Sequence, residues 1–214
     1  MIVTIDGPAG AGKSSTAKSL AQRLGFHFLD TGAMYRAVAL AALESGVDEK
    51  DPEEIGSLAA KIEIVSEGGR VLLQGVDVTD RIRSPEVTVA THIVADHPAV
   101  RERLVTLQRQ IVAGKDFVTE GRDQGTEAFP DARCKIFLTA TPEERARRRA
   151  RERPGKGDWR EVLEEQNARD RRDLARPIGR LRRAEDAIEV KTDGLTQEEV
   201  VDQLEEIVRA ARNR

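Results

Sequence analysis

The segment Gly7 to Ser14, GPAGAGKS, has the residue types and spacing of a phosphate-binding loop, and it lies between a short apolar run and a helical pattern. Glycines let the backbone wrap around phosphates, and the following helix adds positive potential at its N-terminus. We expect Lys13 to reach the β- and γ-phosphates of a nucleotide, and the Ser14 hydroxyl to bind the accompanying Mg²⁺. The plain alternative, a glycine-rich turn with an incidental lysine, is disfavoured by these flanks.

Arginines near strand ends are candidates for binding the group that receives a phosphoryl. Phosphoryl transfer depends on charge neutralisation and in-line positioning more than on a general base. Arg36 follows a predicted strand at residues 26–30. Arg122 and the adjacent Asp123 follow another at residues 117–121. Taken singly, each arginine could equally form a surface salt bridge, but their shared position at strand ends favours the functional interpretation.

The segment RARRRARER, residues 145–153, holds six arginines. It could be a solvated helix face, a nucleic-acid patch, or a lid that folds over ATP phosphates. The net charge of −3 argues against nucleic acid, whereas the glycine-flanked PGKG at residues 154–157 suits a hinge or loop tip in a moving lid. We expect this lid at residues 145–175. Read alone, DRRDLAR at residues 170–176 indicates ion pairs on a helix surface.

Apolar runs and capping signals predict alternating strands and helices. Strands are predicted at residues 1–6, 26–30, 117–121, 134–139 and 187–193. Helices are predicted at residues 14–24, 33–46, from 52 onward, 98–114, 141–176 with a break at 153–159, and in a last segment capped by Thr196 and Glu199. This alternation favours a parallel sheet covered on both faces, with ligands at the carboxyl ends of the strands. Residues 62–95 depart from it, because short strands and glycine turns indicate an antiparallel insert.

Composition bounds the class of protein. The 214 residues, 39% hydrophobic and 34% charged, suit one globular domain, and an aromatic content of 3% argues against a base-stacking nucleic-acid platform. The single Cys134 cannot form an internal disulfide, and we find neither a membrane span nor a secretion signal, so a cytoplasmic protein is expected. No extended heptad run argues for assembly, and we expect a monomer. His27, His92 and His97 lack metal-ligand spacing.

Together these motifs resemble one known family, the bacterial cytidylate kinases, which phosphorylate CMP and dCMP with ATP. The resemblance covers essentially the whole chain and keeps the family's order. It rests on the segments IDGPAGAGKSS, LDTGAMYRA, GVDVTDRIRSPEV, HPAVRERLVTLQR, EGRDQGTEAFPDA, KIFLTATPEERARRR and ARDRRD. Other nucleoside monophosphate kinases share the phosphate loop, but the segment LLQGVDVTDRIRSPEV before the third core strand is typical of the cytidylate type.

The resemblance implies both a fold and a set of partners. The fold would be an α/β, three-layer P-loop kinase with a five-stranded parallel sheet in the order 2-3-1-4-5. A core of residues 1–61, 96–144 and 176–214 would carry a small antiparallel insert at 62–95 on the acceptor side and a helical lid at 145–175. The protein would be a nucleotide-binding transferase of pyrimidine metabolism that uses ATP with Mg²⁺ and acts on CMP or dCMP, with no nucleic-acid or membrane partner.

Site residues carry over from the family by matching position. The ATP-binding residues would be Gly7, Pro8, Ala9, Gly10, Ala11, Gly12, Lys13, Ser14, Ser15 and, from the lid, Arg148. The CMP-binding residues would be Thr31, Tyr35, Arg36, Arg101, Arg122, Asp123, Arg169, Asp173 and Arg176. Arg36 and Arg122 would hold the acceptor phosphate and, with Lys13, would be the catalytic residues. Arg101 and Asp123 would read the cytosine edge, and Asp173 would accept a hydrogen bond from a sugar hydroxyl.

The sequence departs from the family pattern at one position that concerns base selectivity. Nine residues before Arg101, where the family usually has serine, this chain has His92, preceded by Thr91. Three outcomes follow: Thr91 substitutes for the serine, His92 contacts the base, or the chain distinguishes cytosine from uracil less strictly. A site that loses one hydrogen bond to the base would lose about 1–3 kcal/mol.

Two other functions remain open. The first is a P-loop kinase that acts on another small acceptor, such as UMP or a non-nucleotide alcohol; the insert and Asp123 argue against it. The second is a regulator whose state depends on bound ATP and which binds nucleic acid through the arginine-rich helix. The low aromatic content and the negative net charge argue against this regulator.

Overall fold

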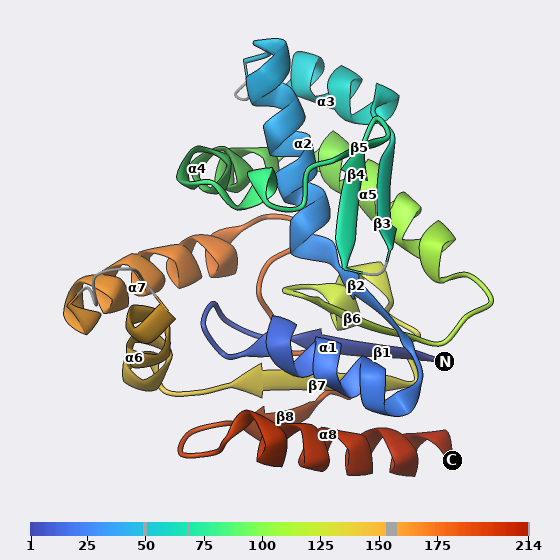
Figure 1. Ribbon diagram of the computed structural model, residues 1–214, viewed down its shortest axis with the longest axis vertical. Coiled ribbons are helices and arrows are strands. Elements are labelled where there is room, and N and C mark those ends of the chain that lie inside the picture. The colour runs from blue at the N-terminus through green and yellow to red at the C-terminus, as the bar shows by residue number, and fades with distance from the viewer. Residues whose placement is uncertain (49–50, 68, 153–157, 214) are drawn as a thin grey trace. The chain divides into compact units, whose positions relative to one another are not determined.

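The computed structural model describes residues 1–48, 51–67, 69–152 and 158–213 (Figure 1). The chain divides into two compact units, which we describe one at a time. Unit 1 comprises Met1–His27 and Lys115–Arg214, and unit 2 comprises Phe28–Gly114. The predicted insert at residues 62–95 therefore forms only a part of unit 2.

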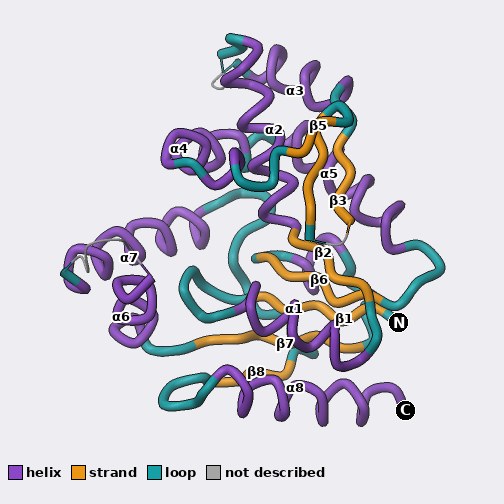
Figure 2. The backbone as a smooth tube through the Cα atoms, viewed as in Figure 1, coloured by secondary structure: helices purple, strands orange, loops and turns teal. Residues whose placement is uncertain are grey.

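Unit 1 contains four strands of a five-stranded sheet, drawn in orange in Figure 2, and only the first residue of the edge strand at residues 27–30 belongs to this unit. The strands of the sheet are β1 (Ile2–Asp6), β2 (His27–Asp30), β6 (Phe117–Gly121), β7 (Cys134–Thr139) and β8 (Ile188–Lys191). They lie in the order β2-β6-β1-β7-β8, and β1 is parallel to both β6 and β7, as β7 is to β8. These labels include three strands of the insert between β2 and β6. Numbered among themselves, the five strands lie in the order 2-3-1-4-5.

The central strands of this sheet are buried, as expected of parallel strands with helices on both faces. Val3, Ile5, Val118 and Leu138 are fully shielded from solvent. Cys134 lies in the same layer, and burial raises the pKa of its thiol to about 11, so it stays protonated and packs as a small apolar side chain. The buried layer of the sheet is therefore built mainly from β-branched and aliphatic side chains.

Four α-helices and one π-helical turn accompany the sheet among the described residues of unit 1. They are α1 (Lys13–Leu24), the turn η2 (Gln124–Ala128), α6 (Pro142–Glu152), α7 (Trp159–Ala175) and α8 (Gln197–Arg212). The predicted capping box is present at α8. The Thr196 hydroxyl accepts the backbone N–H of Glu199, and the Glu199 carboxylate accepts the backbone N–H of Thr196. Gly25 ends α1 with a φ of 67°.

The predicted break within the 141–176 helical segment falls mostly outside the described residues. Helix α6 ends at Glu152 and α7 begins at Trp159. The Asp158 carboxylate caps α7 by accepting the backbone N–H of Arg160 at 3.0 Å. The PGKG segment that we expect to act as a hinge, residues 154–157, lies outside the part of the chain that the structure describes.

Unit 2 combines helices with a small antiparallel sheet. Its elements are α2 (Thr31–Ser45), α3 (Pro52–Lys61), β3 (Ile64–Glu67), β4 (Arg70–Leu73), β5 (Val76–Asp77), the 3₁₀ turn η1 (Arg81–Arg83), α4 (Pro85–Val94) and α5 (Pro98–Val112). The strand order is β3-β4-β5, and Ile64 pairs with Leu73. The predicted small antiparallel sheet is present, and it is followed by η1 and α4.

Local capping explains where two of these helices begin. The Asp51 carboxylate accepts the backbone N–H groups of Glu53 and Glu54, and Pro52 occupies the first helical position of α3. Helix α4 begins in the same way, with Ser84 as N-cap and Pro85 after it. Among the described residues, none of the helices is both long and apolar enough to span a membrane.

Candidate functional site

The predicted phosphate loop joins β1 to α1 in unit 1. Its backbone requires glycine at Gly7, because a Cβ there would lie 2.0 Å from the carbonyl oxygen of Leu138. Gly12 adopts a φ of 86° directly before the helix starts at Lys13. The Lys13 side chain is buried and folds back over the loop, where its Nζ donates to the carbonyl oxygen of Pro8 at 2.7 Å. The loop therefore has the strand–glycine–helix context that the sequence predicts.

The environment of Lys13 is electrostatically unfavourable to its own charge. Burial lowers the pKa of its ammonium group from 10.5 to about 7, and the positive charges of Arg122 and Arg169 act in the same direction. Glu120 and Asp6 oppose this shift without cancelling it. An anion placed at the loop would restore the charged form of Lys13, so the electrostatics favour a phosphate ligand.

Ser14, the predicted Mg²⁺ ligand, faces a carboxylate. Its hydroxyl donates to Glu120 Oε1 at 2.8 Å, and Glu120 is the penultimate residue of β6. Because the hydroxyl hydrogen is directed at Glu120, the oxygen lone pairs of Ser14 point elsewhere. A hydroxyl and a carboxylate oxygen side by side form the kind of oxygen donor set that Mg²⁺ prefers, so these residues fit the metal. No cluster of three or more His, Cys, Asp or Glu side chains suited to a metal occurs among the described residues.

Three of the predicted acceptor-binding arginines converge on Asp173. Arg122 Nε donates to Asp173 Oδ2 at 2.9 Å, Arg176 lies 3.1 Å from Oδ1, and Arg169 lies 4.0 Å from Oδ2. The Asp173 side chain is only 3% exposed. Its burial acts to raise the pKa of the carboxyl, but the charges of the three arginines outweigh burial and hold the pKa below its ordinary value. The helix-surface ion pairs suggested by the spacing alone are therefore part of a buried cluster.

Asp123, predicted to read the base, begins the π-helical turn after β6. The side chain is 5% exposed, and the backbone carbonyl accepts the N–H of Glu127 at 2.8 Å. Arg122 and Asp123 thus leave the end of β6 on a turn whose backbone is hydrogen-bonded within itself.

Two residues of the arginine-rich region reach the phosphate loop, and the sequence did not single out either of them. Arg145 of α6 donates from NH1 to the carbonyl oxygen of Ala9 at 2.8 Å and to Asp170 Oδ2 at 2.6 Å. Asp170 of α7 accepts the N–H of Ala9 on its other oxygen at 3.2 Å. The three groups form a closed ring of hydrogen bonds that joins both helices to the loop. No sequence signal links positions 145 and 170, because they meet only when α6 packs on α7.

The remaining predicted ATP-binding arginine lies elsewhere on α6. Arg148 pairs with Glu144 at 3.0 Å and donates to the hydroxyl of Thr192 at 2.8 Å and to its carbonyl oxygen at 2.5 Å. Its guanidinium therefore contacts the chain just after β8, whereas Arg145 contacts the loop. Of the two, only Arg145 is bonded to a phosphate-loop residue by these contacts.

Helices α6 and α7 pack through the single tryptophan. The side chain of Trp159 contacts a small cluster formed by Ala146, Ala150 and Val162. Two guanidinium groups, those of Arg147 and Arg160, lie over its ring, each 4.9 Å from the ring centroid. Trp159 therefore packs between the two helices directly after Asp158, the N-cap of α7.

Unit 2 holds the other predicted acceptor residues on α2 and α5. Arg36 NH1 donates to the Thr88 hydroxyl at 2.8 Å and to the carbonyl oxygen of Ile82 at 3.1 Å, so α4 and the turn before it orient the guanidinium. Arg101 is 4% exposed, and its guanidinium lies 5.4 Å from the centroid of the Tyr35 ring. Thr31, the first residue of α2, is also buried. Within unit 2 the structure pairs Arg101 with Tyr35 and reveals Thr88, which the sequence analysis missed.

Thr91 and His92, where the sequence departs from the family pattern, lie on α4. Thr91 donates its hydroxyl hydrogen to the carbonyl oxygen of Val87 at 2.5 Å, one turn earlier on α4. Its hydrogen is therefore used within the helix, which argues against Thr91 as a donor to a base. His92, the next residue, is partly exposed.

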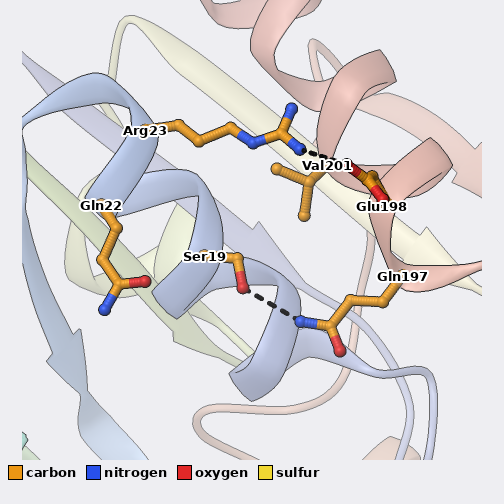
Figure 3. Close-up of a pocket in the computed structure, with 6 residues that line it drawn as sticks. All are labelled: Ser19, Gln22, Arg23, Gln197, Glu198 and Val201. Carbon is orange, nitrogen blue, oxygen red and sulfur yellow. Dashed lines mark hydrogen bonds and ion pairs between the residues drawn. The ribbon is translucent and has the colours of Figure 1, made fainter.

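A surface pocket in unit 1 lies apart from the predicted site residues. Figure 3 shows it between α1 and α8. It is lined by Ser19, Gln22, Arg23, Gln197, Glu198 and Val201. Gln197 donates to the Ser19 hydroxyl at 3.0 Å, and Arg23 lies 3.6 Å from Glu198. These contacts link the two helices, and none of the pocket residues is among those predicted to bind a nucleotide.

Comparisons with known proteins agree on one family. A family model described as cytidylate kinase matches residues 3–210. A cytidylate kinase of Rhodopirellula baltica is 51% identical over 212 residues, which cover 98% of this chain and 93% of that protein. One from Caldanaerobacter subterraneus subsp. tengcongensis is 48% identical over 210 residues, covering 97% and 94%. A solved structure of an uncharacterized protein from Eubacterium ventriosum has a similar fold, with a TM-score of 0.56 at 16% identity over 100% and 99% of the two chains.

Proposed function

Because this chain belongs to the cytidylate kinase family, we propose that it transfers the γ-phosphoryl group of ATP to CMP and dCMP, yielding ADP and the diphosphates. The observation that carries the proposal lies within unit 1. There the phosphate loop with Lys13, the carboxylate of Glu120 beside Ser14, and the arginine cluster on Asp173 belong to one compact unit.

The donor nucleotide is proposed to bind at the phosphate loop, residues 7–15. The backbone N–H groups and the helix N-terminus attract the triphosphate, and Lys13 regains its proton as negative charge arrives. Arg145 extends the predicted donor site, because it already contacts Ala9. Arg148 remains proposed as an ATP-binding residue from its position in the family pattern.

Ser14 is proposed to hold the Mg²⁺ that accompanies ATP, with Glu120 beside it. The metal would supply charge neutralisation at the β- and γ-phosphates. The support for this assignment is the hydroxyl–carboxylate pair at 2.8 Å, whose geometry directs the Ser14 hydrogen toward Glu120.

The acceptor nucleotide is proposed to bind the residues that match the family pattern. Arg36 and Arg122 would hold its phosphate, Arg101 and Asp123 would read the cytosine edge, and Asp173 would accept from a sugar hydroxyl. Arg169 and Arg176 would support this role of Asp173, and Thr31 and Tyr35 would pack beside the base. Support comes from the burial of Arg101, Asp123 and Asp173, since buried charged side chains need specific partners.

The reaction is a direct displacement. An oxygen of the acceptor phosphate forms a bond to the γ-phosphorus as the bond from that phosphorus to the bridging oxygen of ADP breaks. Lys13 and the arginines spread the developing charge over fixed donors, so no covalent intermediate on the enzyme is needed. We further propose a cytoplasmic location, supported by one buried thiol in a chain without a second cysteine.

A coupled ADP-release assay with Mg-ATP against CMP, dCMP, UMP, dUMP, AMP and GMP tests the proposal. We expect turnover with CMP and dCMP far above that with the purine monophosphates. Comparable turnover with UMP would show that His92 relaxes base selectivity. No turnover with any acceptor, together with steeply salt-dependent binding to DNA or RNA, would refute the kinase and favour a nucleic-acid regulator.

A further inference from the structure

A buried carboxylate at the end of β1 binds the turn that directly follows two of the proposed acceptor-binding residues, Arg122 and Asp123. Asp6, the residue before Gly7, is 3% exposed. Its Oδ1 accepts the backbone N–H of Gln124 at 2.9 Å, and its Oδ2 accepts that of Gly125 at 2.7 Å. Both oxygens of one side chain are therefore engaged by consecutive amides of the π-helical turn η2.

These two hydrogen bonds fix the turn immediately after Asp123. The preceding residues, Arg122 and Asp123, leave β6 at the point where Gly121 is paired with Asp6 across the sheet. The π-helical turn has few alternatives for satisfying the amides of Gln124 and Gly125, because buried N–H groups without an acceptor are costly. The turn packs closely against β1 here, since a Cβ added at Gly125 would lie 2.9 Å from Thr4 Oγ1.

The same carboxylate is held at a cost, which indicates a purpose other than stability. Burial raises its pKa from 3.8 to about 7, and repulsion by Asp123 adds to the rise. The two backbone N–H groups and the charge of Lys13 act in the opposite direction. The Asp6 carboxylate therefore interacts electrostatically with both Asp123 and Lys13, while its two oxygens bind the turn after β6.

We infer that Asp6 is a positioning residue that holds η2 so that Asp123 is presented correctly to the acceptor base. The inference rests on the proposed function for the identity of the acceptor. It assigns a role in acceptor affinity and base selectivity to a residue of the donor-loop strand. Asp6 itself touches neither the donor nor the acceptor in this role; it acts through the backbone of Gln124 and Gly125.

The test variant is Asp6→Asn, which preserves the size of the side chain. An amide has one acceptor oxygen and one NH₂ group, so an NH₂ must face one of the two backbone N–H groups. Assays at pH 8 keep the wild-type carboxyl ionised. We expect the KM for CMP to rise about ten-fold, the effect of losing one net hydrogen bond, while the KM for ATP changes less than about two-fold. The ratio of kcat/KM for CMP over UMP should fall, because Asp123 is no longer fixed.

Thr119→Val is the matched control. Thr119 is fully buried in β6, close to Asp6 in the sheet, and its hydroxyl oxygen makes no hydrogen bond. We expect this variant to leave both KM values and the CMP to UMP ratio unchanged. If Asp6→Asn raised the KM for ATP and the KM for CMP equally, the effect would lie in the phosphate loop and the inference would be wrong. Unchanged kinetics in a folded Asp6→Asn variant would also overturn it.

Amide hydrogen exchange, resolved by residue, separates this inference from the proposed function. In the wild-type protein the amides of Gln124 and Gly125 should exchange at least about a hundred-fold more slowly than fully exposed amides, and in Asp6→Asn they should lose protection. Rapid exchange of both amides in the wild type would refute the positioning role even if the variant failed to fold. Protection without any CMP turnover would instead leave Asp6 holding the turn and refute the proposed kinase activity.

Discussion

Arg122 donates its Nε hydrogen to Oδ2 of Asp173 at 2.9 Å, which joins the turn after β6 to helix α7. The contact spans 51 positions in the sequence and lies within unit 1. Because Arg176 and Arg169 approach the same carboxylate, one buried aspartate orients three guanidinium groups. This shared orientation is what makes the cluster suitable for an anionic, hydroxyl-bearing ligand such as a nucleotide.

Replacing Asp173 should therefore affect the acceptor selectively. In Asp173→Ala we expect the KM for CMP to rise by roughly 10- to 100-fold, because hydrogen bonds to charged groups contribute about 1.5–3 kcal/mol, and the KM for ATP to rise much less. Steady-state kinetics with each substrate varied in turn provides the measurement. Glu164→Ala, an exposed position on α7, is the control and should leave both constants unchanged. Equal effects of Asp173→Ala on both substrates would contradict the assignment.

Removing the Lys13 side chain should reduce turnover without disrupting the fold. Lys13→Ala should lower kcat by roughly 10²–10³-fold, as expected when a charge-stabilising donor is removed, while circular dichroism shows an intact fold. Lys18→Ala, an exposed lysine on α1, is the control. Near-normal turnover in Lys13→Ala would remove the phosphate loop from the mechanism.

The stability of the nucleotide-free protein should reveal the lowered pKa of Lys13. Between pH 7 and 10.5 the folded protein binds fewer protons at Lys13 than the unfolded chain does, so this group makes the free energy of unfolding rise with pH, by at most about 1.4 kcal/mol per pH unit. The free energy of unfolding of wild type minus that of Lys13→Ala should therefore increase from pH 7 to pH 9 in urea denaturation. A difference that stays constant would mean that Lys13 is charged when buried.

The ring formed by Ala9, Arg145 and Asp170 predicts a contrast between two arginines of α6. Arg145→Met should raise the KM for ATP about ten-fold or more, because it leaves the buried Asp170 carboxylate and the carbonyl of Ala9 without that partner. Arg149→Met removes a guanidinium that is 51% exposed and paired with Glu152, and should have little effect. Similar kinetics for the two variants would show that the ring does not shape the donor loop.

Replacing Thr88 should weaken acceptor binding, because Thr88 orients Arg36. Thr88→Val keeps the shape of the side chain but removes the oxygen that accepts from Arg36 at 2.8 Å. We expect the KM for CMP to rise roughly three- to ten-fold with no change in the KM for ATP, since one hydrogen bond contributes about 0.5–1.5 kcal/mol. Val89→Ala, at the exposed neighbouring position, is the control. A normal KM for CMP in Thr88→Val would mean that the hydrogen bond from Arg36 to Thr88 does not orient Arg36 for the acceptor.

The sequence predicted those features that depend on local pattern. The strands at Phe117–Gly121 and Cys134–Thr139 were predicted at their observed bounds, because short segments rich in apolar and β-branched residues between loop signals are typical of buried strands. The phosphate loop was predicted from residues contiguous in the chain. The caps at Asp51 and Thr196 likewise follow from residues within one turn of the helices that they begin.

The features that escaped prediction depend on contacts between distant segments. The pairing of Arg145 with Asp170 requires α6 to pack on α7, and the bonds from Gln124 and Gly125 to Asp6 require β1 and β6 to be neighbours. Helix α4 was missed for another reason: its signal, Ser84 followed by Pro85, lay within the segment treated as an antiparallel insert, and no helix was assigned there. The roles of the site residues toward ATP and CMP came from the family resemblance and not from local pattern.

The packing of Trp159 gives the protein an intrinsic optical reporter. Its indole is the single tryptophan of the chain and lies beneath the guanidinium groups of Arg147 and Arg160, where α6 meets α7. Cationic groups at that distance alter indole emission, so its fluorescence intensity and wavelength depend on how these two helices are packed. Rearrangement of this helix pair during turnover can therefore be followed in real time by stopped-flow fluorescence, in the unmodified protein and without an added dye.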